Sequence, residues 1–126
     1  MKPPKRSSRR YRPEAIDRRT HAERAVAMFN AGAFWEAHEE LERIWRAVPD
    51  EDEAAVLQGL IQAAAALLHR ERGNRHGVDV VGGAGLHKLA GPQHPAVEFE
   101  TVAFRRGLEG ALRGDGPPPT LQLRCV

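Results

Sequence analysis

The chain has 126 residues, of which 41% are hydrophobic and 29% charged, a composition typical of one soluble globular domain and not of a disordered chain. A single cysteine, Cys125, excludes an intramolecular disulfide and a cysteine-cluster metal site. The longest apolar stretch, residues 54–68, is interrupted by polar residues and is shorter than the roughly 20 residues of a membrane span. We therefore expect a cytoplasmic protein without a membrane partner.

Positive charge is concentrated at the amino terminus. Six of the 19 Lys and Arg residues and none of the 17 acidic residues fall in residues 1–12, so the rest of the chain is mildly acidic. We expect residues 1–12 to form a flexible basic arm, because they offer little apolar surface to bury. Two roles remain open: a solubilising tail, or a salt-dependent contact with phosphate backbones. We expect no part of the chain other than this arm to bind a nucleic acid.

The pattern of apolar residues after the arm predicts helices joined by short connections. Thr20 and Glu23 have the spacing of a capping box at the start of a first helix, and Gly32 suits the position that ends it. A second helix is expected over residues 34–47. The third is expected over residues 52–72, because four acidic residues in a row suit the amino-terminal end of a helix.

The second half of the chain has a weaker helical pattern. Four glycines lie in the segment 74–90, and each costs about 1 kcal/mol relative to alanine in a helix interior, so we expect a loosened or broken helix. A further helix is expected over residues 96–113, followed by a proline-rich turn and an extended tail over residues 114–126. The sequence thus predicts an all-α fold, with residues 13–113 forming a single-domain antiparallel bundle of four to five helices around a central helical hairpin.

Two polar residues on each helix of this hairpin are expected to meet. His38 and Glu42 share one face of the second helix, and Gln58 and Gln62 share one face of the third, because residues four apart are neighbours on a helix. With the connecting turn near residue 50, antiparallel packing sets Glu42 level with Gln58 and His38 level with Gln62. We therefore predict a polar cluster in the seam between the two helices.

Three further residues flank this predicted cluster: Trp35, Trp45 and His69. We expect the two tryptophans to pack in the core or at an interface. His69 lies seven residues beyond Gln62, about 10 Å along the helix axis at about 1.5 Å per residue, so we expect it at the far end of the hairpin and not on an ion shared with His38. The remaining histidines are expected on the surface: His21, His76, His87 and His94.

Two hypotheses for the cluster remain open. In the first, His38 and Glu42 bind one divalent metal ion, as the two histidines of an HExxH helix do, and Glu39 occupies the position of the general base. A zinc site needs three or four protein ligands, whereas the sequence places only two. In the second, His38 and Glu42 form a buried hydrogen-bond network with Gln58 and Gln62, which fixes the register of the hairpin without catalysis.

Residues 29–77 carry three motifs in succession: FNAGAFWEAHEELERIWR, LQGLIQAAAALLH and GNRHG. In combination they resemble the signature of the small helical "domain of unknown function 309" family. The resemblance implies an all-helical fold, and members of the family are sometimes labelled predicted metal-dependent hydrolases. A metal-dependent hydrolase is therefore the enzyme hypothesis, with its substrate and its oligomeric state left open. After residue 77 the chain departs from the family, which has there a regular helix rich in Ala and Leu.

Overall fold

The computed structural model describes residues 15–114 and 116–124 of the chain. Five helices lie in this part: α1 (Arg18–Asn30), α2 (Phe34–Ala47), α3 (Glu51–Glu71), α4 (Arg75–Lys88) and α5 (Val102–Arg113). The described residues contain no strand, only one isolated bridge. The all-α prediction is confirmed. The predicted basic arm, residues 1–12, lies outside the described residues, as does Cys125.

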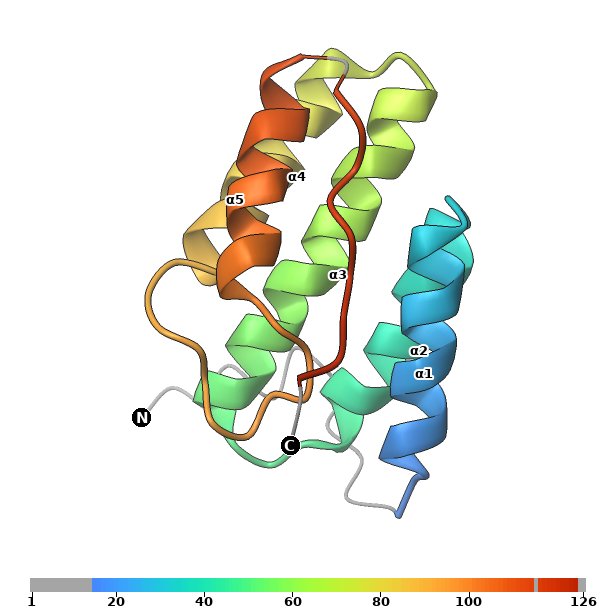
Figure 1. Ribbon diagram of the computed structural model, residues 1–126, viewed down its shortest axis with the longest axis vertical. Helices are drawn as coiled ribbons and strands as arrows, with labels where there is room; N and C mark the ends of the chain where they lie inside the picture. The colour runs from blue at the N-terminus through green and yellow to red at the C-terminus, as the bar shows by residue number, and fades with distance from the viewer. Residues whose placement is uncertain (1–14, 115, 125–126) are drawn as a thin grey trace, which may run out of the picture.

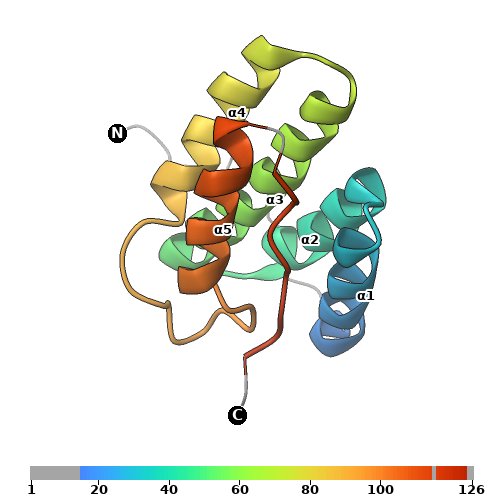
Figure 2. The same ribbon diagram turned by 45° about the horizontal axis from the view of Figure 1, so that its top comes forward.

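The long helix α3 lies at the centre of the bundle (Figure 1). It packs against α2 on one side and α4 on the other, while α1 packs against α2 and α5 contacts α4. The segment after α5 runs in extended form along the bundle, between α5 and the α1–α2 pair (Figure 2). Every helix in the described part is too short or too polar to cross a bilayer.

Aromatic side chains join the first two helices to the last one. The ring of Phe29 lies edge-on to the rings of Phe34 and Phe104, with centroid distances of 5.1 and 5.4 Å. The carboxyl-terminal segment covers this region through the buried side chain of Leu121. The Asn30 side chain donates to the carbonyl of Leu121 and accepts from its amide, both at 2.9 Å, so it holds this segment to the end of α1.

The start of α1 differs from the prediction. The helix begins at Arg18, and Asp17 is its N-cap, whereas we expected Thr20. The Asp17 carboxylate accepts hydrogen bonds from the Thr20 hydroxyl at 2.7 Å and from the Thr20 amide at 3.1 Å, and these bonds lower the pKa of Asp17. The stabilisation by this cap is therefore present at neutral pH and is lost as the pH falls through that lowered value.

The expectation of a broken helix over residues 74–90 was wrong. Helix α4 is continuous, and Gly85, one of its four glycines, lies directly against the backbone of α3. A Cβ atom at Gly85 would lie only 3.1 Å from the backbone oxygen of Gly59, and one at Gly59 only 2.9 Å from Cγ of Leu89. The close contact of the two helix backbones thus offsets the low helix propensity of glycine.

The last helix is shorter than predicted. It begins at Val102, and residues 96–101 form a loop instead of its first turns. Phe99 is buried in this loop and pairs with Leu123 through the isolated antiparallel bridge, while the Gln93 side chain donates to the Phe99 carbonyl at 2.9 Å. These long-range contacts with the carboxyl-terminal segment outweigh the helical spacing of the apolar residues.

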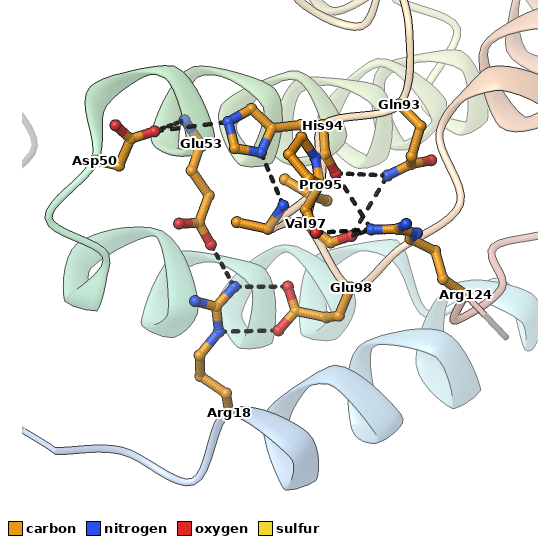
Figure 3. A network of polar contacts seen from close by, with 10 residues as sticks. Arg18, Asp50, Glu53, Gln93, His94, Pro95, Val97, Glu98 and Arg124 are labelled. Atoms are coloured by element: carbon orange, nitrogen blue, oxygen red, sulfur yellow. Dashed lines mark hydrogen bonds and ion pairs between the residues drawn. The ribbon is translucent and has the colours of Figure 1, made fainter. Parts of the chain in front are cut away.

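A network of charged groups ties α1 to the start of α3 and to this loop (Figure 3). The Arg18 guanidinium binds both carboxylate oxygens of Glu98, at 2.7 and 2.9 Å, and one oxygen of Glu53, at 2.7 Å. Burial alone would lower the pKa of Arg18, but its hydrogen bonds to Glu98 and Glu53 outweigh burial and raise this pKa. Glu53 is only 5% exposed, so Arg18 neutralises a buried carboxylate.

Candidate functional site

Charged side chains form a row along α2. The imidazole Nε2 of His38 lies 4.0 Å from one carboxylate oxygen of Glu42, and the other oxygen lies 3.6 Å from Nη2 of Arg46. The three residues are four apart, so they share one face of the helix. All three side chains are half-buried, and His38 Nδ1 and Arg46 Nε are buried atoms without a hydrogen-bond partner among the described residues.

The residues of the predicted cluster form no direct hydrogen bond across the seam between α2 and α3 in the described part of the chain. No hydrogen bond in the described part of the chain joins Glu42 to Gln58 or His38 to Gln62, and the buried Oε1 of Gln62 has no partner there. The Cβ atom of Gln62 lies toward α4, since it is only 3.3 Å from where a Cβ of Gly85 would be. The ionic contacts of Glu42 are thus with His38 and Arg46 of its own helix and not with the glutamines.

His38 instead shares a surface depression with residues that lie about one to three turns beyond Gln62 in the chain. This depression, which we call the Trp35 depression, has a volume of about 170 Å³. It is lined by Phe34, Trp35, His38, Ala65, Leu68, His69 and Arg72. The structure thus brings together two histidines, His38 and His69, that we expected at different heights of the hairpin.

The two aromatic residues of this depression are stacked. The Trp35 indole lies nearly parallel to the His38 imidazole, at an angle of 8° and with ring centroids 5.3 Å apart. Trp35 is 52% exposed, so it does not lie in the core. On the opposite wall the Asn74 amide nitrogen lies 3.2 Å from His69 Nδ1, which orients that ring. By contrast, Trp45 is half-buried and packs against the core.

Glu39, the predicted general base, lies elsewhere. It lines a second pocket of about 250 Å³, between α1 and α2, which we call the α1–α2 pocket. The residues around this pocket are Ile16, His21, Glu39, Glu42, Arg43, Arg46 and Ala47. The structure therefore separates Glu39 from the Trp35 depression, and of the predicted residues only Glu42 joins Glu39 in this pocket.

His21 also lines this pocket, although we expected it on the surface. Its Nδ1 lies 2.7 Å from a carboxylate oxygen of Glu40, and both side chains are largely buried. The signal that could have identified His21 is the short connection at Gly32. It makes α1 and α2 antiparallel and sets His21 level with Glu40 and Arg43.

The described residues do not supply a complete metal site. Within residues 15–114 and 116–124, no group of three or more His, Cys, Asp or Glu side chains is arranged to hold an ion. His38 and Glu42 provide two donors, fewer than the three protein ligands of a catalytic zinc site. Metal binding by His38 and Glu42 therefore stays a prediction.

The fold and the site define a small helical bundle with a His–Glu–Arg row on α2 and a pocket on either side of that helix. Residues 22–81 match the family model described as "Domain of unknown function (DUF309)". The match confirms that the chain resembles this family over these residues. No curated protein and no solved structure matches the chain. The matched region contains the whole lining of the Trp35 depression, whereas Ile16 and His21 of the α1–α2 pocket precede it.

Proposed function

We propose that this protein is a non-catalytic binding module and that the Trp35 depression binds a small organic anion with a flat apolar body. The observation that carries this proposal is the exposed indole of Trp35, stacked on His38 at the rim of the depression. A large aromatic side chain that is half-exposed and held by a second ring offers a ready face for a ligand.

The other residues of the depression support the same ligand class. Leu68 and Ala65 provide an apolar wall, and the Arg72 guanidinium forms no ion pair with another described residue. An arginine without a carboxylate partner suits a ligand carboxylate or phosphate. The volume of about 170 Å³ is below the roughly 300 Å³ at which sites for drug-sized ligands begin, so the ligand body is about one ring in size.

Benzoate should bind at this depression more tightly than benzamide, which has the same ring but no negative charge. Replacing Arg72 with Gln or Trp35 with Leu should weaken benzoate binding about tenfold each, because each change removes a contact of at least about 1.4 kcal/mol. Isothermal titration calorimetry of the full chain measures these affinities. Arg106→Gln, at an exposed arginine of α5, is the matched control and should leave the affinity unchanged.

Two results would contradict the proposal. If benzamide binds as tightly as benzoate, Arg72 does not recognise the carboxylate. If Arg106→Gln weakens benzoate binding as much as Arg72→Gln does, only the net charge of the protein matters. Thermal melts of each variant separate a lost contact from a lost fold.

The second candidate function is the metal-dependent hydrolase that the family resemblance suggests. The spacing of 4.0 Å between His38 Nε2 and Glu42 Oε2 favours it, since two donors on one helix face can reach one ion. The donor set falls short of a catalytic site, so we derive no reaction step from it. If the binding-module proposal holds, untagged protein contains no stoichiometric transition metal and melts at the same temperature with and without chelator. One equivalent of metal that is lost in His38→Ala would instead favour the hydrolase.

A further inference from the structure

We propose that the α1–α2 pocket is a second binding site and that its ligand is a small zwitterion of the amino-acid class. The pocket lies on the other side of α2 from the Trp35 depression, and nothing in the family match assigns a role to it. Its walls carry groups of both charges, which is the pattern that a molecule with one carboxylate and one ammonium group requires.

The first argument is the charge that the pocket leaves unpaired. Glu39 and Arg43 lie four residues apart on α2, a spacing that usually gives an ion pair. Neither of them forms an ion pair with any residue in the described ranges, although both line the pocket. One carboxylate and one guanidinium are therefore available to a ligand from the same helix face.

Arg46 supplies a second donor for the ligand carboxylate. Its Nη2 lies 3.6 Å from Glu42, but its Nε is a buried atom without a hydrogen-bond partner in the described part of the chain. A buried donor without a partner is unfavourable, and a hydrogen bond from it to a ligand oxygen would satisfy it. Arg43 and Arg46 lie three residues apart on α2, so one carboxylate can reach both guanidinium groups.

His21 completes the polar wall of the pocket. The bond of 2.7 Å between its Nδ1 and Glu40 orients the ring and leaves Nε2 as the ring nitrogen available to a ligand. Ile16 and Ala47 add a small apolar surface, and the volume of about 250 Å³ limits the side chain of the ligand. The ligand class that fits is thus an α-amino acid, with its carboxylate at Arg43 and Arg46 and its ammonium group at Glu39.

Calorimetric titration of the full chain with L-alanine, L-glutamine and L-phenylalanine tests this inference. At least one of them should bind, while propionate and ethylamine, which each keep one of the two charges of alanine, should bind at least about tenfold more weakly than alanine or not at all. Arg43→Gln and Glu39→Gln should each weaken binding of the amino acid about tenfold. The matched control is Glu36→Gln, at an exposed glutamate of α2 that does not line the pocket, and it should have no effect.

Three outcomes would overturn the proposal. None of the three amino acids binds at millimolar concentration; propionate binds as well as alanine, which would define a simple anion site; or Glu36→Gln weakens binding as much as Glu39→Gln. Because Trp35 and Arg72 do not line this pocket, Trp35→Leu should leave amino-acid binding intact, so failure here is distinct from failure of the Trp35 depression.

Discussion

Replacing Gly85 with leucine should lower the free energy of unfolding by about 3 kcal/mol, although leucine favours a helix more than glycine does. A Cβ atom at this position would lie 3.1 Å from the Gly59 backbone oxygen and 3.3 Å from Gln62 Cβ. Backbone atoms of α3 cannot rotate away as a side chain can, so a larger side chain must push α4 from α3. Urea unfolding followed by circular dichroism measures the loss.

Gly83 is the matched control for this prediction. It lies two residues earlier on the same helix, and a Cβ atom there would meet no atom within 4 Å. Gly83→Ala should therefore raise stability by up to about 1 kcal/mol through helix propensity alone. Similar effects of Gly83→Leu and Gly85→Leu would show that α3 and α4 do not approach each other as closely as we describe.

Replacing Arg18 with alanine should lower the free energy of unfolding by about 2 kcal/mol. The change leaves the Glu53 carboxylate, which is 5% exposed, without its counter-charge. Breaking a fully buried ion pair costs about 3–5 kcal/mol, and we expect less here because the Arg18 side chain is 35% exposed and solvent screens part of its charge. Chemical unfolding of the full chain measures the difference.

The neighbouring arginine provides the control for this prediction. Arg19 pairs with Glu23 at 3.0 Å, but both side chains are exposed, so Arg19→Ala should change stability by less than about 0.5 kcal/mol. Adding Glu53→Gln to Arg18→Ala should restore part of the loss, because the side chain at residue 53 then carries no buried charge. A double variant that is no more stable than Arg18→Ala alone would show that the cost has another origin.

The helices that could be predicted from the sequence are those whose capping residues and apolar spacing already indicate the helix found in the structure. The bounds of α2 and α3 were correct to within about one residue, because an acidic N-cap region and a proline mark the turn between them. Helix α4 could not be predicted, since its glycines weaken a helix locally and only the contact with Gly59 reveals why residue 85 is a glycine. The predicted start of α5 was wrong because it also depends on a long-range contact. Phe99 forms a bridge with Leu123, 24 positions away, so residues 96–101 form a loop and not the first turns of the helix.

The candidate site could be predicted only in part. Placing His38 and Glu42 on one face of α2 needs only the helix repeat, and that placement agrees with the structure. Their partners on α3 depend on the crossing angle and axial offset of two helices, which a count of residues around a turn does not contain. In the structure His38 shares the Trp35 depression with Ala65 and His69, whereas Gln62 does not line it.

The most direct test of the binding-module proposal is a nuclear magnetic resonance titration. Benzoate is added to protein whose histidines are labelled with ¹⁵N, and the histidine ring signals are monitored. If the Trp35 depression is the ligand site, the ring signals of His38 and His69 shift together and saturate. The signals of His87, in the last turn of α4 and outside the depression, stay in place. If the signals of His38 and His69 stay in place, or if all histidine signals move alike, the proposal is wrong.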